Sequence, residues 1–253
     1  MWNVLKSWLN GDMGMAGRFQ YQAIHGYSTL AVMLVLATVV VLGLNGSPRL
    51  HRRMLKGICW FQLTFEAVWR LIYLFINGSD IVTLWPAFPC NLGGLLLPVI
   101  ALCKWDAGKR MFYLFGFVGG VLTFAFPVGI FGRDVLVFPI LKSILQHTGL
   151  LMIPAVEYVS GSFRPQVRDM GWVILGLLIH LFNCEVLTRC FGLTGDYMYL
   201  RGTLPFVIPG VPQYITVSMA ALLTLTGLSA ALDAAARYLP SHQHHHTPSA
   251  DVR

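Results

Sequence analysis

Long apolar stretches alternate with short polar segments along the chain, and this alternation predicts membrane-spanning helices. A helix needs about 20 apolar residues to cross the hydrocarbon core of a bilayer. The stretches that meet or approach this length are about residues 22–45, 56–77, 89–104, 110–132, 135–157, 170–192 and 204–238. We therefore expect an all-α polytopic membrane protein with seven transmembrane helices.

The composition supports this class of protein. Hydrophobic residues make up 56% of the 253-residue chain and charged residues 11%, about half the charged fraction of an average soluble domain. The formal net charge of +7 does not indicate a nucleic-acid partner, because the basic residues are divided among short loops.

The distribution of Lys and Arg predicts the orientation, because positively charged loops stay in the cytoplasm. One set of alternate loops, with the C-terminal tail, carries Arg49, Arg52, Arg53, Lys56, Lys104, Lys109, Arg110, Arg164, Arg168, Arg237 and Arg253. The opposite set carries Lys6, Arg18, Arg133, Arg189 and Arg201. We expect an outside N-terminus, a cytoplasmic C-terminus and a multi-pass protein of the plasma membrane.

The two ends of the chain differ from the apolar part between them. Residues 1–21 lack the apolar core of a signal peptide and hold tryptophans suited to a membrane interface, so we expect an interfacial segment. Residues 22–238 form the seven-helix domain. Residues 239–253 are polar and His-containing, and we expect them to be disordered.

The cysteines do not follow a pattern of metal ligands. They are Cys59, Cys90, Cys103, Cys184 and Cys190. Since neither metal-ligand spacing nor a nucleotide motif is present, we expect no cofactor. A disulfide framework is not indicated, although a Cys90–Cys190 bridge between the outer ends of two helices stays an alternative.

Ionisable side chains inside the apolar spans need a reason, because inserting one costs at least about 2.5–3.5 kcal/mol. Glu66 and Arg70 are one helical turn apart and can form an ion pair. This pair either holds helices together or serves a function, with Arg70 suited to bind a phosphate. Ser143 and His147 have the same spacing, and His147 is either a general base or a buried structural histidine. For Lys142 we favour snorkelling to the outer interface.

The segment 85–94 places one thiol among prolines and glycines. Cys90 lies at the predicted start of the third span, where backbone N–H groups are free and favour a nucleophilic thiolate. These donors and the Asn91 amide can receive a developing oxyanion, and Gly93 and Gly94 leave room for a substrate carbonyl. The alternative for Cys90 is a small buried hydrophobic residue, the usual role of a membrane cysteine.

Several short motifs follow one another along the chain. They are Trp69-Arg70, Pro89-Cys90-Asn91-Leu92, Phe126-Pro127, His147, Asn183 and Gly195-Asp196-Tyr197-Met198-Tyr199-Leu200. In this order they resemble the YwaF family of bacterial integral membrane proteins and the related animal transmembrane protein 164. The resemblance covers about residues 20–235. It departs at Asp196, where the family commonly has asparagine.

This resemblance implies a membrane-embedded acyltransferase or transacylase. Such an enzyme moves a fatty acyl chain between a phospholipid and a lysophospholipid through a cysteine thioester. Carried over to the matching positions, Cys90 is the nucleophile and His147 the base. The implied substrate-binding residues are Arg70, Asn91, Asn183 and Tyr197.

The alternative is a seven-helix transporter or ligand-binding membrane protein, in which Glu66, Arg70 and His147 would form a proton or ligand pathway. No internal repeat is evident, which weakens the transporter interpretation. Replacing Cys90 by serine would leave such a protein working but would abolish acyl transfer.

Overall fold

The computed structural model describes residues 1–76, 78–80, 84–127, 129–193, 195–198, 211 and 213–236. Within these ranges the regular structure is helical, apart from an isolated bridge between Ala16 and Arg133. The predicted all-α class is therefore confirmed. The tail predicted to be disordered lies outside the described ranges.

A helix lies in each range predicted as a span. The helices are α2 (Ala23–Asn45), α3 (Pro48–Phe75), α4 (Pro89–Cys103), α5 (Asp106–Ala125), α6 (Phe138–Val159), α7 (Met170–Leu181) and α9 (Gln213–Ala236). The 3-10 turn η2 (Val167–Asp169) precedes α7, and the π-helix η3 (Phe182–Leu187) and α8 (Thr188–Cys190) continue it.

Four of these segments are long and apolar enough to cross a membrane, namely Ala23–Asn45, Pro48–Phe75, Val167–Cys190 and Ile215–Ala236. The helix α4 is apolar but shorter. Membrane-spanning helices are thus confirmed as a feature of the chain, while the count of seven spans and the orientation of the termini stay predictions.

The helix α3 begins earlier than expected. The side chain of Ser47 accepts a hydrogen bond from the backbone N–H of Leu50, and Pro48 occupies the first helical turn. Both residues favour the start of a helix. The basic residues 49–56, interpreted as a loop, therefore lie on the first turns of α3.

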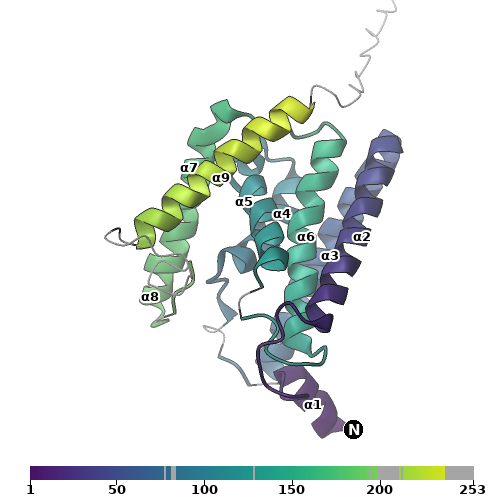
Figure 1. The fold of residues 1–253 in the computed structure, drawn as a ribbon, viewed down its shortest axis with the longest axis vertical. Helices are drawn as coiled ribbons and strands as arrows, with labels where there is room; N and C mark the ends of the chain where they lie inside the picture. Colours follow the sequence, from purple (N-terminus) through teal and green to yellow (C-terminus); the bar gives the residue numbers. More distant parts are fainter. Residues whose placement is uncertain are drawn as a thin grey trace, which may run out of the picture.

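The helices α3, α4, α5 and α6 pack against one another and form the centre of the molecule (Figure 1). Leu97 and Ile100 of α4 join a buried core with Met111 of α5 and Leu150 of α6. On the outside of this group, α2 lies along α6, α7 lies along α5, and α9 crosses α5 and η2. The central position of α4 brings its first turn next to both α3 and α6.

The N-terminal segment forms a short helix, α1 (Trp2–Asn10), at one end of the molecule (Figure 1). The indole of Trp8 donates a hydrogen bond to the carbonyl of Leu136, at 2.9 Å. Leu9 is buried against Trp69 and Phe138. The helix α1 is thus packed against the ends of α3 and α6 that lie next to the start of α4.

Candidate functional site

Cys90 lies in the first turn of α4, which begins at Pro89. Its thiol is free and partly buried. The sulfur is 4.0 Å from Oδ1 of Asn91 and lies against the backbone N–H groups of Asn91 and of Cys90 itself. The predicted helix-start position is confirmed. The alternative Cys90–Cys190 disulfide is wrong, because both thiols are free.

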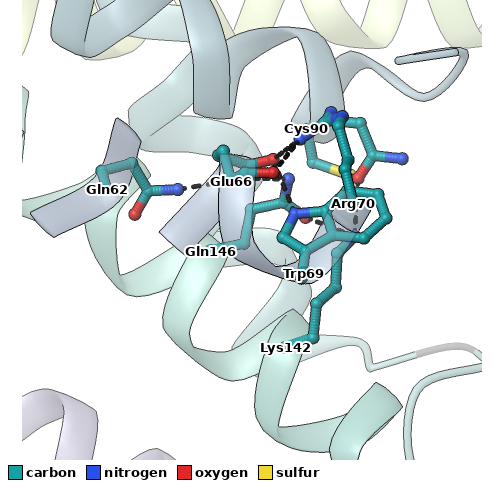
Figure 2. Close-up of polar contacts among 8 residues, drawn as sticks. Gln62, Glu66, Trp69, Arg70, Cys90, Lys142 and Gln146 are labelled. Atoms are coloured by element: carbon teal, nitrogen blue, oxygen red, sulfur yellow. Dashed lines mark hydrogen bonds and ion pairs between the residues drawn. The ribbon is translucent and has the colours of Figure 1, made fainter. Parts of the chain in front are cut away.

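A fully buried carboxylate, that of Glu66, lies at the centre of the polar contacts beside Cys90 (Figure 2). It accepts hydrogen bonds from Nε2 of Gln62 at 3.2 Å, Nε1 of Trp69 at 2.8 Å and Nε2 of Gln146 at 2.7 Å. It also forms an ion pair with Arg70. The predicted pairing of Glu66 with Arg70 is confirmed.

Lys142 joins this buried carboxylate network to the segment that carries Cys90. Its Nζ donates to Oδ1 of Asn91 at 2.9 Å and to Oε1 of Gln146 at 3.0 Å. It also lies 4.5 Å from the centroid of the Trp69 ring, on which Arg70 packs as well. The expectation that Lys142 snorkels to the interface is wrong, because its ammonium has these partners inside the protein.

The space beside Gly94 is filled by protein side chains. A Cβ atom at Gly94 would lie 2.5 Å from Oε1 of Glu66 and 2.9 Å from Nε2 of Gln146. At Gly93, a Cβ atom would lie 3.1 Å from Leu150. These glycines therefore let α4 approach α3 and α6, and the room expected there for a substrate carbonyl is occupied.

His147 is buried on α6, and the hydrogen bonds of its ring are local. Its Nδ1 is 2.7 Å from the carbonyl oxygen of Ser143 and 3.3 Å from the hydroxyl of the same residue. Among the residues that the structure describes, no hydrogen bond joins His147 to Cys90. The structure thus brings Lys142, and not His147, into the hydrogen-bond network around Cys90.

The π-helix η3 holds the segment that leads into α4. Asn183 accepts a hydrogen bond from the indole of Trp85 at 2.9 Å and donates to the carbonyl of Pro86 at 2.8 Å. The thiol of Cys184 donates to the carbonyl of Ala87 at 2.8 Å. A π-helix often marks a functional site. The amide of Asn183, expected to bind substrate, is instead engaged in positioning this segment.

The other expected substrate-binding residues lie around the same end of α4. The ring of Tyr197 packs edge-on against Phe88, at 5.0 Å between centroids. Arg70 is largely buried, and within the described part of the chain its Nη2 has no hydrogen-bond partner. Of these residues, Arg70 therefore has a buried guanidinium nitrogen without a hydrogen-bond partner among the described residues. Tyr199 and Leu200 of the last motif lie outside the described residues.

Sequence reasoning missed Gln62 and Gln146 and misplaced Lys142. Gln62 precedes Glu66 by one helical turn, and Lys142 precedes Gln146 by one turn, as both hydrogen bonds show. The same spacing rule that paired Glu66 with Arg70 could therefore have identified these two pairs. Their contacts with other helices had no comparable signal in the sequence.

Comparison with known proteins supports a family assignment. No curated protein and no solved structure matches the chain. The family model of the TMEM164 family matches residues 18–229, a range that contains the whole site described above. The resemblance to transmembrane protein 164 is thereby confirmed, and the chain belongs to the TMEM164 family.

Proposed function

We propose that this protein is a membrane-embedded acyltransferase in which Cys90 carries a fatty acyl chain as a thioester. The observation that carries the proposal is the position of Cys90. It is a free, partly buried thiol in the first turn of α4, beside an amide that is hydrogen-bonded to an ammonium group. A nucleophile next to donors and a cation suits acyl transfer.

The proposed reaction has two half-reactions. The sulfur of Cys90 attacks the ester carbonyl of a phospholipid, the new S–C bond forms, and the C–O bond to the glycerol breaks, so that a lysophospholipid leaves. The hydroxyl of an acceptor lysophospholipid then attacks the thioester and releases the sulfur. In this reaction the backbone N–H groups of the first turn of α4 stabilise the oxyanion.

Arg70 is the proposed contact for the phosphate of the lipid. Its Nη1 is occupied by Glu66, whereas Nη2 has no partner among the described residues. A guanidinium binds phosphate well because its donors match the phosphate oxygens. Tyr197 is proposed to line the same region, since its ring packs on Phe88, two residues before Cys90.

The proposal includes a seven-span topology in the plasma membrane, with the N-terminus outside. The helices in all the expected ranges and the position of the basic residues support it. In this arrangement Cys90 faces the outer half of the bilayer.

The covalent mechanism is tested with purified protein incubated with a labelled phospholipid and analysed by intact mass. We expect a hydroxylamine-sensitive acyl adduct on the unmodified protein and none on Cys90→Ser. Turnover should fall by about three orders of magnitude or more in Cys90→Ser. Cys103→Ser is the matched control, because Cys103 is an exposed thiol at the other end of α4. Turnover that survives in Cys90→Ser would contradict the mechanism.

A transporter or ligand-binding protein is the second candidate, and the unpartnered Nη2 of Arg70 favours it. In that case the site around Glu66 and Arg70 would bind an anion without chemistry, and His147 would take part in the pathway. Cys90→Ser should then leave binding or transport unchanged, so the same variant separates the two functions.

A further inference from the structure

We propose that Lys142 is the proton acceptor of Cys90, so that the two side chains share one proton. The resemblance implied His147 for this role, and no motif pointed to Lys142. The catalytic consequence rests on the acyltransferase function proposed above. The shared proton itself can be tested without a lipid substrate.

The contacts of Lys142 support this assignment. Its Nζ donates to Oδ1 of Asn91 at 2.9 Å, and the sulfur of Cys90 is 4.0 Å from the same oxygen. A second hydrogen bond, to Gln146, and the Trp69 ring hold the ammonium in place. A lysine nitrogen has three positions for protons or a lone pair. Two are used by Asn91 and Gln146. The proposal assigns the third to the proton that Lys142 exchanges with Cys90, which lies on the other side of the shared Asn91 oxygen.

The charges of the buried cluster point to the same conclusion. Glu66 and Arg70 cancel one another as an ion pair. Within the described part of the chain, these two are the charged groups that act on Cys90 and Lys142 besides each other. A thiol beside an ammonium would leave one uncompensated positive charge in a largely buried site, which is unfavourable.

Two other proton distributions leave the cluster neutral. One pairs a Cys90 thiolate with a Lys142 ammonium, and the other pairs the thiol with the neutral amine. They contain the same atoms and differ only in the position of one proton. Movement of this proton from sulfur to nitrogen therefore activates Cys90 without adding net charge to the buried cluster.

His147 is less suited to this exchange. Its Nδ1 is bound to the carbonyl of Ser143, one turn earlier on α6. Residues 143 and 147 share a face of the helix that is turned by about 100° from the face of Lys142 and Gln146. The face with Lys142 is the one whose side chains form hydrogen bonds with α3 and α4.

No proton is gained or lost by the protein over the two half-reactions. When the Cys90 thiolate attacks the ester, the proton held by Lys142 passes to the departing glycerol oxygen, and Lys142 becomes neutral. When the acceptor hydroxyl attacks the thioester, its proton passes to Lys142 as the C–S bond breaks. The thiolate and the ammonium are then restored, and no further reactant is needed.

The test is the rate at which iodoacetamide alkylates Cys90 in the purified full-length protein, measured for each cysteine by peptide mass spectrometry. Iodoacetamide reacts with the thiolate and not with the thiol. The variant Lys142→Gln removes the charge but keeps an N–H donor for Asn91. We expect the Cys90 rate near neutral pH to fall about tenfold or more. The difference between the two proteins should shrink as the pH is raised, because more of the thiol in the variant is then ionised.

Two internal standards make this measurement specific. Cys103 is exposed and should react equally in the unmodified protein and in the Lys142 variants. Lys104→Gln removes a cation at the opposite end of α4 and should leave the Cys90 alkylation rate unchanged.

Lys142→Met repeats the test without an amide if Lys142→Gln does not fold. Lys142→Arg keeps the charge but does not release its proton, so it should keep the alkylation rate and lose acyl transfer.

Three results have distinct meanings. Equal Cys90 rates near neutral pH in the unmodified protein and Lys142→Gln would overturn the shared proton. A loss of the same size at every pH would also overturn it, because it would show lost access to the sulfur and not a change in its ionisation. A Lys142-dependent rate without any acyl adduct from phospholipid would support the shared proton and contradict the proposed acyltransferase.

Discussion

Glu66 compensates the charge of Arg70 from a fully buried position. The substitution Glu66→Gln removes this charge and leaves the largely buried Arg70 without its ion-pair partner. Breaking a buried ion pair by removing one partner costs about 3–5 kcal/mol. We therefore expect a large decrease in the free energy of unfolding, measured by denaturant titration of the detergent-solubilised protein.

The control for Glu66→Gln is Asp12→Asn, which removes a largely exposed carboxylate 4.0 Å from Arg133. An exposed ion pair contributes about 0–1 kcal/mol. The double variant with Glu66→Gln and Arg70→Met should recover part of the stability, because it also removes one uncompensated charge. If Glu66→Gln is as stable as Asp12→Asn, the carboxylate does not hold the cluster together.

Some side-chain contacts could be predicted from the sequence, and others could not. Glu66–Arg70 and Ser143–His147 followed from the spacing of one helical turn, and both contacts are present. The bond between Lys142 and Asn91 joins two helices. Its prediction needs the rotation of each helix about its axis, which hydrophobic periodicity does not define when a helix is apolar on most sides.

At the scale of elements, the close approach of α4 to α3 and α6 depends on Gly94. In Gly94→Ala the new methyl group would lie 2.5 Å from Oε1 of Glu66, so either the carboxylate network or α4 must shift. We expect a loss of about 1–3 kcal/mol in the free energy of unfolding, measured by denaturant titration. We also expect a changed rate of Cys90 alkylation by iodoacetamide, measured by peptide mass spectrometry.

Gly119→Ala on α5 is the matched control, because a methyl group added there would meet no heavy atom of another described element within 4 Å. Alanine is the better helix former, so this variant should lose no stability. Equal behaviour of Gly94→Ala and Gly119→Ala would show that α4 does not need the glycine for packing.

The element boundaries also differ in how far they could be predicted. The end of the first span at residue 45 agrees with the end of α2, but the Ser47 cap starts a new helix at once and α3 runs through the basic residues. The π-helix η3 was not predicted. Residues 182–187 hold neither Pro nor Gly, and the local change in winding accompanies the bonds of Asn183 and Cys184 to residues 85–87.

At the scale of the whole molecule, the site belongs to the central helices, and the outer helices present apolar side chains. Leu34 on α2 is 61% exposed and Leu223 on α9 is 71% exposed. Lipid contact accounts for such exposure, because apolar side chains are favourable in hydrocarbon. The apolar runs predicted these helices well. They did not predict which helices are central, since that depends on a few polar residues and glycines.

The orientation can be tested with two native thiols. Cys103, at the end of α4, and Cys190, at the end of α8, are both exposed. If the basic loops are cytoplasmic, Lys104 places Cys103 inside and Cys190 lies outside. A membrane-impermeant maleimide added to intact cells should label Cys190 and leave Cys103 unlabelled, whereas permeabilised cells should show both labels by peptide mass spectrometry. Cys190→Ser and Cys103→Ser identify each signal. Since Cys90 and Cys103 lie at opposite ends of α4, labelling of Cys103 in intact cells would invert the topology and place Cys90 in the cytoplasmic half.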